Sequence, residues 1–344
     1  MNRLIALALL LVTSAIGASA AYGGAANGGL PGAPSNPLAG ITWGPYRIAS
    51  ADPNGKDPVS AYFNTAHSDA DRATFNKLLS VPRFRWFGAW NANPRDAASS
   101  YIQEVTHGNP DIGVQIGIFR LVPFEHAACS RLPTSSEISA YKDWIVQFAA
   151  GIGSARVALL LQPDMPFTLC LPHHSPIDLQ LISWTVQRFD ALAHTTVYID
   201  AGAGDWMKPG TMASMLKRAG VAQARGFALD LTHFDSTPHE VAYGKKILAA
   251  LARKGVRGKH FVVDTSKNGR PFTTQAHKRA FLSGKVCASR TSTACVTLGQ
   301  PPTTSTGSAA VDAYLWLGRP WINNATRRSY DEVLQLVRSS PYFG

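Results

Sequence analysis

Short apolar runs alternate with longer amphipathic stretches along most of the chain. Seven runs rich in β-branched and aromatic residues predict strands, at residues 83–88, 114–122, 157–162, 196–200, 226–231, 260–264 and 312–317. Apolar residues spaced three and four positions apart predict helices between them, at 136–150, 177–193, 211–219 and 240–253. Start signals fit three of these helices: Ser135 ahead of Glu137, the pair Ser175-Pro176, and Pro238 ahead of Glu240.

Strands that alternate with helices of this length indicate βαβ units around a parallel sheet, and hence an α/β protein. The Gly-x-Gly-x-x-Gly pattern that binds dinucleotides does not follow the first strand. Seven such units therefore favour a TIM-like barrel over a dinucleotide-binding sheet. No internal repeat divides the chain, so we expect a single barrel domain over residues 41–344.

The first forty residues are expected to lie outside this barrel. Arg3, the apolar run 4–12 and the small residues 18–20 have the pattern of a cleavable signal peptide over residues 1–20. Residues 21–40 are rich in Gly, Ala and Pro and predict a flexible leader. No later run is long enough to cross a bilayer, so we expect a secreted or periplasmic protein without a membrane anchor.

The cysteines agree with export. There are four of them, and an even number is typical of a protein that forms disulfides in an oxidising compartment. Of the three possible pairings we favour Cys129–Cys170 together with Cys287–Cys295, although one pair could stay reduced and buried. No Cys-x-x-Cys or His-x-x-x-His spacing occurs, so we expect no metal and no cofactor.

The charge of the chain is strongly basic, with 33 Lys and Arg against 22 Asp and Glu. Such a balance is compatible with an acidic partner, but the basic residues are scattered and match no nucleic-acid-binding motif. We therefore expect a solvated surface on a monomer rather than a nucleic-acid or membrane partner.

Acidic residues follow four consecutive predicted strands. Asp164 follows VALLLQP, Asp200 ends TVYID, Asp230 ends GFALD and Asp264 ends HFVVD. One such acid could simply cap a helix. In a parallel barrel, however, the carboxyl ends of all strands open on one face, so we expect at least two of these acids to line a cleft.

A cleft rich in Asp suits general acid–base chemistry such as glycosidic hydrolysis. One carboxylic acid donates a proton to the leaving oxygen, and a second group activates water or attacks the sugar. Crowding of carboxylates raises the pKa of one of them, which keeps it protonated. Tryptophans at or after strand ends could stack on sugar rings, or could belong to the core: Trp86, Trp90, Trp206, Trp316 and Trp321. For Trp316 we favour the core.

Several longer motifs resemble consecutive blocks of glycoside hydrolase family 6, the cellulase family. They are RWFGAWN, YKDWIVQFAAGIG, TVYIDAGAGDW, ARGFALDLTHF, YGKKILAAL, GKHFVVDTSKNG, LGQPPTTSTG and VDAYLWLGRP. They occur in the family's order over about residues 80 to 325. The resemblance implies a distorted seven-stranded parallel β/α barrel, an inverting mechanism and β-1,4-glucan as substrate.

The resemblance also implies roles for individual residues. Asp164 corresponds to the family's general acid, and Asp200 to an aspartate that orders the site and stabilises charge. Trp206 and Trp86 correspond to tryptophans that stack on substrate. Gln162 stands where the family usually has Glu.

The chain departs from the family pattern in three loops. The segment LVPFEHAACSR lacks the Asp that tunes the general acid, which leaves Glu125 or His126 in its place, while Cys129 keeps a cysteine. Near the C-terminus the family's Lys, Glu and Asp are replaced by Gly318, Ile322 and Asn324, the last at the position of the candidate base. Val286 replaces a Trp.

Two functions follow from these residues. The first is hydrolysis of a β-1,4-glucan, with Asp164, Asp200 and Glu125 as the catalytic set. Asp230, His233 and Asn324 are then candidates for hydrogen bonds to substrate. The alternative, favoured by Asn324, Gly318 and Val286, is a carbohydrate-binding protein on an impaired hydrolase barrel.

Overall fold

The computed structural model describes residues 36–46, 57–272, 284–323 and 326–343. The predicted signal peptide, most of the predicted leader and Asn324 lie outside these residues. Within them, no helix is both long and apolar enough to span a membrane.

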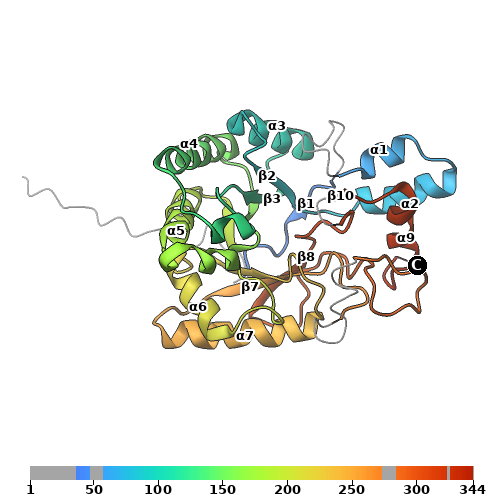
Figure 1. Ribbon diagram of the computed structural model, residues 1–344. Coiled ribbons are helices and arrows are strands. Elements are labelled where there is room, and N and C mark those ends of the chain that lie inside the picture. Colours follow the sequence, from blue (N-terminus) through green and yellow to red (C-terminus); the bar gives the residue numbers. More distant parts are fainter. Residues whose placement is uncertain (1–35, 47–56, 273–283, 324–325, 344) are drawn as a thin grey trace, which may run out of the picture.

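The centre of the fold is one parallel sheet that curls on itself (Figure 1). Its strands are β1 (Thr42–Trp43), β2 (Arg85–Gly88), β3 (Ile112–Phe119), β4 (Val157–Leu161), β5 (Thr195–Asp200), β6 (Gly226–Leu229), β7 (His260–Asp264) and β8 (Val311–Leu315). From β3 to β8 each strand pairs with the next along the chain. Both β1 and β2 pair with β3, β1 near its start and β2 near its end. The seven predicted strands correspond to β2–β8.

The two edges of the sheet approach each other without forming a ladder between the described strands. The backbone N–H of Phe84, just before β2, donates to the carbonyl of Trp316, just after β8, at 3.0 Å. The indole Nε1 of Trp86 donates to the carbonyl of Leu317 at 2.8 Å. The sheet is thus a curled half-barrel, which confirms the predicted distorted seven-stranded parallel barrel and gives its strands one shared carboxyl end.

The helices that alternate with the strands cover the outside of this sheet (Figure 1). The structure contains α1 (Val59–Asn64), α2 (Asp69–Leu79), α3 (Pro94–Thr106), α4 (Ser135–Ile152), α5 (Ile177–Asp190), α6 (Pro209–Arg218), α7 (Thr237–Arg253) and α9 (Tyr330–Arg338). The four predicted helices are α4–α7. The start of α4 is set by Thr134, one residue before the predicted Ser135, because Thr134 and Glu137 form a reciprocal capping box.

Apolar side chains fill both faces of the sheet. Inside the half-barrel, Leu160, Tyr198, Val262 and Leu315 are buried. A larger cluster lies between the sheet and α3–α7, and a third packs α1, α2 and α9 against the segment after β8. That third cluster contains Trp316 and Trp321, both fully buried, so the predicted core position of Trp316 is confirmed.

A short antiparallel pair follows β8: β9 (Ile322–Asn323) with β10 (Thr326–Arg327). Both disulfides have the favoured pairing. Cys129–Cys170 joins two short 3₁₀ helices, η1 (Glu125–Cys129) and η2 (Met165–Cys170), which follow β3 and β4. Cys287–Cys295 closes a loop ahead of β8. The first bridge therefore fixes two neighbouring loops at the carboxyl end of the barrel.

Candidate active site

The four strand-end acids meet at the carboxyl end of β4–β7. The hydroxyl of Thr232, in the loop after β6, donates to Asp164 Oδ1 at 2.8 Å. Asp164 and Asp200 interact electrostatically, as do Asp230 and Asp264. These contacts cross from one strand end to the next, so the topology brings together side chains that are far apart in the sequence.

Asp164 is half-buried in a left-handed backbone conformation, with φ 62°. Burial raises the pKa of its carboxyl. The Thr232 hydrogen bond and the charges of His233, Lys267 and Arg319 oppose that rise by favouring the ionised form. A raised pKa keeps a carboxyl protonated closer to neutral pH, which is what a general acid requires.

Asp200, at the end of β5, interacts electrostatically with Asp164 and is 1 % exposed. Its two carboxyl oxygens accept hydrogen bonds from the backbone N–H groups of Met165 and Gly202, each at 3.2 Å. Burial and the nearby Asp164 raise the pKa of Asp200 well above its ordinary value. Asp200 therefore ties together the loops after β4 and β5. Its raised pKa favours the protonated form of Asp200 next to Asp164.

Glu125 supplies a third carboxyl from the start of η1. It is half-buried, and burial and the proximity of Asp164 raise its pKa, while His126 and Arg319 lower it. The Cys129–Cys170 disulfide joins the ends of η1 and η2, and η2 begins directly after Asp164. The cross-link thus holds Glu125 within electrostatic reach of Asp164.

Two cations complete the site, and the sequence analysis did not identify either. Lys267 Nζ donates to the carbonyl of Leu231 at 2.5 Å and lies among Asp264, Asp230 and Asp164. Burial lowers its pKa, while these three acids raise it. The guanidinium of Arg319 lies 4.0 Å from the centre of the Trp86 ring. Lys267 follows the strand-end Asp264 by three residues, a spacing that could have drawn attention to it.

The structure leaves no room for a side chain at Gly318, the position that the motif resemblance predicts to correspond to a Lys of the family. A Cβ at Gly318 would lie 2.5 Å from Asp264 Oδ2 and 2.8 Å from the Leu231 carbonyl oxygen. Lys267 donates to that same carbonyl. Positive charge near this point comes from Lys267, after β7, and from Arg319, the residue that follows Gly318.

Trp206 and His233 form the aromatic part of the site. Their rings stack at 5.1 Å with an interplanar angle of 16°, and Phe167 meets Trp206 edge-on at 5.3 Å. Asp205 orients His233 through a contact with Nδ1 at 2.7 Å. Both Trp206 and His233 are half-buried.

Trp86 is less accessible than the sequence suggested. It is 7 % exposed, it packs against Phe119, and Arg319 covers a face of its ring. A sugar can stack on Trp86 only where Arg319 moves aside.

Asp230 and Asp264 are buried and bonded internally. Asp264 accepts from the backbone N–H groups of Ser266 and Leu317, at 2.9 and 3.0 Å. Asp230 is 0 % exposed and accepts from the backbone N–H of Asp235 at 3.1 Å. Full burial of Asp230 argues against its predicted hydrogen bond to substrate and gives it a role in holding the loop after β6.

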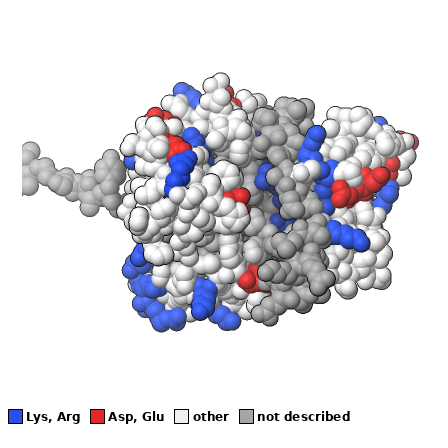
Figure 2. Space-filling view, viewed as in Figure 1, with Lys and Arg blue, Asp and Glu red and all other residues white. Residues whose placement is uncertain are grey.

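The surface agrees with the scattered charge noted in the sequence. On the face shown in Figure 2, Lys and Arg lie in several separate groups with Asp and Glu between them.

A protein-family model described as "Glycosyl hydrolases family 6" matches residues 48–324. The chain belongs to glycosyl hydrolase family 6. The match contains all seven main strands, every strand-end acid and both disulfides, and it confirms the resemblance inferred from the motifs.

Similar proteins include two curated family 6 relatives. Endoglucanase 1 of Streptomyces halstedii is 30% identical over 223 residues, which are 64% of this chain and 68% of that protein. Endoglucanase 1 of Streptomyces sp. (strain KSM-9) is 28% identical over 250 residues, 71% of this chain and 64% of the relative. The chain thus spans about two thirds of the length of these relatives.

A solved structure with the same fold is the endoglucanase Cel6 of Mycobacterium tuberculosis, in complex with methyl-cellobiosyl-4-deoxy-4-thio-β-D-cellobioside. It has a TM-score of 0.70 and 24% identity, and the match covers 88% of this chain and 98% of that one. The catalytic core of the cellobiohydrolase Cel6A from Chaetomium thermophilum has a TM-score of 0.65 at 21% identity, covering 83% and 86%.

Proposed function

We propose that this family 6 member hydrolyses β-1,4-glucosidic bonds of cellulose or a related β-glucan, with inversion and with Asp164 as the general acid. The observation that carries the proposal is the environment of Asp164: it is a half-buried carboxyl with a raised pKa, and the acids Asp200 and Glu125 lie within electrostatic reach of it. The names of the curated relatives and the bound cello-oligosaccharide analogue of the structural neighbour support the substrate class.

In this mechanism the Asp164 carboxyl donates its proton to the glycosidic oxygen as the bond from that oxygen to the anomeric carbon breaks. Water attacks the anomeric carbon from the opposite face and loses a proton, so the product has inverted configuration. Glu125, which interacts electrostatically with Asp164, is the candidate for this role, and it takes the proton directly or through a second water.

The two cations act on Asp164 after proton transfer. Lys267 and Arg319 both favour its ionised form. They therefore stabilise the carboxylate that is left when the proton has moved, while burial keeps the proton in place beforehand. The stacked pair Trp206 and His233 offers a half-buried aromatic surface for a pyranose ring.

We further propose that the protein acts outside the cytoplasm as a monomer. Two disulfides in a chain of this size are typical of oxidising compartments, and the N-terminal pattern is that of a signal peptide.

The test is hydrolysis of cellohexaose by purified protein, followed by chromatography of the shorter products. The Asp164→Asn variant should lose activity by about 10²- to 10⁴-fold, the usual contribution of a general acid. Asp190→Asn is the matched control, because Asp190 is also a half-buried acid with a raised pKa but lies at the far end of α5. Equal activity in both variants would reject Asp164 as the acid.

Binding of a β-glucan without turnover is the competing function, and Gly318 in place of the Lys of the family pattern favours it. In that case calorimetry would show that cellohexaose binds to the wild-type protein. The cellohexaose would remain intact on prolonged incubation with the protein at a concentration that saturates binding.

A further inference from the structure

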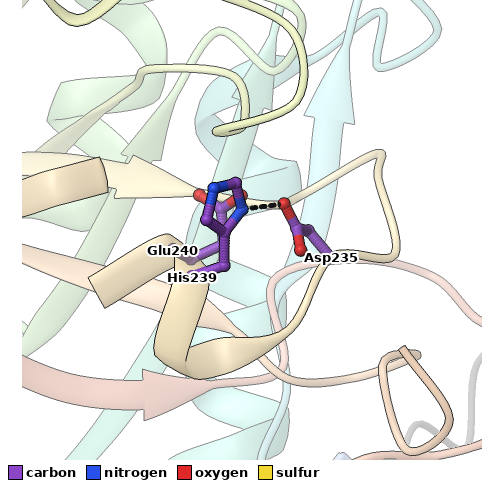
Figure 3. Close-up of side chains that lie close together, drawn as sticks. All are labelled: Asp235, His239 and Glu240. Atoms are coloured by element: carbon purple, nitrogen blue, oxygen red, sulfur yellow. Dashed lines mark hydrogen bonds and ion pairs between the residues drawn. The ribbon is translucent and has the colours of Figure 1, made fainter. Parts of the chain in front are cut away.

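A second group of ionisable side chains lies next to the candidate active site, at the start of α7. It consists of Asp235, in the loop after β6, and His239 and Glu240, in the first turn of α7. One ligand atom from each of the three side chains lies within 4.8 Å of the other two. Figure 3 shows the carboxyl of Glu240 behind the imidazole of His239, with Asp235 on the other side of the ring.

The spacing of these atoms is close to what a single ion requires. Zinc–ligand distances of about 2.0–2.2 Å place two ligands on one ion at most about 4.4 Å apart, so small side-chain movements would suffice. The Nδ1 atom of His239 already meets Asp235 Oδ2 through a short hydrogen bond. A metal ion would take the place of the proton in this hydrogen bond.

An unpaired carboxylate oxygen marks the place of the cation. Glu240 is 0 % exposed, and its Oε1 accepts from the backbone N–H of Gly204 at 2.7 Å. Its Oε2 has no hydrogen-bond partner. Asp230 Oδ2 is also buried without a partner, and Asp230 lies next to this group because its Oδ1 accepts from the Asp235 backbone. Buried carboxylate oxygens without a donor are costly, and a bound cation removes that cost.

The site also has an entrance. The side chain of His239 is 48% exposed, whereas that of Asp235 is 2% exposed. An ion can therefore enter from solvent past the imidazole, and water can complete its coordination. The mixture of one imidazole and two carboxylates suits a transition metal such as zinc better than calcium, which takes six to eight oxygen ligands.

We propose that Asp235, His239 and Glu240 form a binding site for one divalent transition-metal ion, with Zn²⁺ as the fitting ion. The site links three loops at the carboxyl end of the barrel. Glu240 holds Gly204, two residues before Trp206, and Asn268, after β7, donates to the Asp235 carbonyl at 3.1 Å. An ion here would fix the loop that carries Trp206 without touching substrate.

The experiment measures zinc in tag-free protein after equilibrium dialysis against Zn²⁺, by elemental analysis and titration calorimetry. Wild-type protein should retain one Zn²⁺ per chain, and its melting temperature should rise with Zn²⁺ concentration. His239→Ala and Glu240→Gln should each weaken binding by about 100-fold, at least as much as the loss of an outer-shell partner. Glu240→Gln keeps the acceptor for Gly204, so it separates lost charge from lost folding.

His107→Asn serves as the control, since His107 is exposed and ends α3 in a left-handed conformation that Asn tolerates. It should bind Zn²⁺ like wild type. X-ray absorption should show one nitrogen and otherwise oxygen ligands at about 2.0 Å. No zinc in wild-type protein, or equal zinc in wild type and His239→Ala, would overturn the proposal. Neither result depends on glucanase activity.

Discussion

Two groups of carboxyl side chains lie at the same end of the barrel, and their charge is balanced in different ways. The cleft acids are Asp164, Asp200 and Glu125. Burial raises the pKa of Asp164 and of Glu125, while Lys267 and Arg319 oppose that rise at Asp164 and Arg319 opposes it at Glu125. The inner acids are Asp235 and Glu240. Burial raises the pKa of Glu240 well above its ordinary value, and the neighbouring acids Asp235 and Asp205 raise it further.

This difference in charge balance separates two roles of closely spaced carboxyl groups, proton transfer and cation binding. In the cleft, burial and a neighbouring acid favour the protonated form, and nearby cations are ready to stabilise the ionised form, so a proton can move in both directions. Among the inner acids, Glu240 Oε2 has no hydrogen-bond partner, and the proposed metal ion would supply one. The following predictions test the comparison, beginning with the largest effect.

Glu125→Gln should lower kcat on cellohexaose by about 100-fold with little change in KM, because the amide cannot accept the proton lost by water. The acidic limb of the pH–rate profile should disappear at the same time. Glu104→Gln, a half-buried Glu on α3, is the control. An unchanged kcat in Glu125→Gln would show that Glu125 does not accept the proton from water and that another group is the base.

Asp178→Asn tests a buried acid that belongs to neither group. Asp178 is 1 % exposed, and burial raises its pKa from 3.8 to about 7. A pKa raised on folding adds stability below pH 4 that is lost as the pH rises through 7. Wild type should therefore lose about 2–3 kcal/mol of unfolding free energy between pH 5 and pH 8 through this group, and the variant should not.

Urea unfolding at the two pH values measures this difference. The result is independent of substrate and metal, so it measures only the effect of burial on the pKa of Asp178. Parallel pH dependence in wild type and variant would mean that burial does not hold a proton on Asp178.

Trp206→Ala should raise KM for cellohexaose by about threefold to tenfold while kcat changes less, because the ring provides contact area but no proton. Trp184→Ala is the matched control: Trp184 is partly exposed on α5 and is contacted by Lys142 and Arg188. If both variants keep the wild-type KM, the stacked pair Trp206 and His233 is not a substrate surface.

Thr232→Val should give the smallest effect, and a specific one. The Thr232 hydroxyl stabilises ionised Asp164, so its removal raises the pKa of Asp164 further. A general acid works while protonated, and the basic limb of the kcat profile should therefore move to higher pH by up to about one unit. Thr211→Val, at an exposed position on α6, should leave the limb in place.

The strands could be predicted from the sequence because they are buried on both faces and so form continuous apolar runs. The predicted strand at 157–162 corresponds closely to β4 at Val157–Leu161. Helix α1 was missed because it has only 6 residues, too few for a helical period to show. Both favoured disulfide pairings are confirmed: Cys287–Cys295 closes a short loop, and Cys129–Cys170 ties together two loops that follow neighbouring strands.

Asp164 and Asp200 were accessible to sequence analysis because each follows a strand and parallel strands share one end, whereas Glu125 was found through the family resemblance. Lys267 and Arg319 lie in loops, where no periodicity says which way a side chain points. The inner acids were missed because metal ligands were sought as Cys-x-x-Cys or His-x-x-x-His. The group actually combines an Asp before a helix with the pair His239-Glu240 inside its first turn.

The central claim, that Asp164 is the acid of an inverting β-1,4-glucanase, is tested most directly by proton NMR of cellohexaose during hydrolysis. Wild-type protein should first produce α-anomer signals at the new reducing ends, and Asp164→Asn should produce none in the same time. Initial β-anomer signals, or equal α-anomer signals from the variant, would contradict the account.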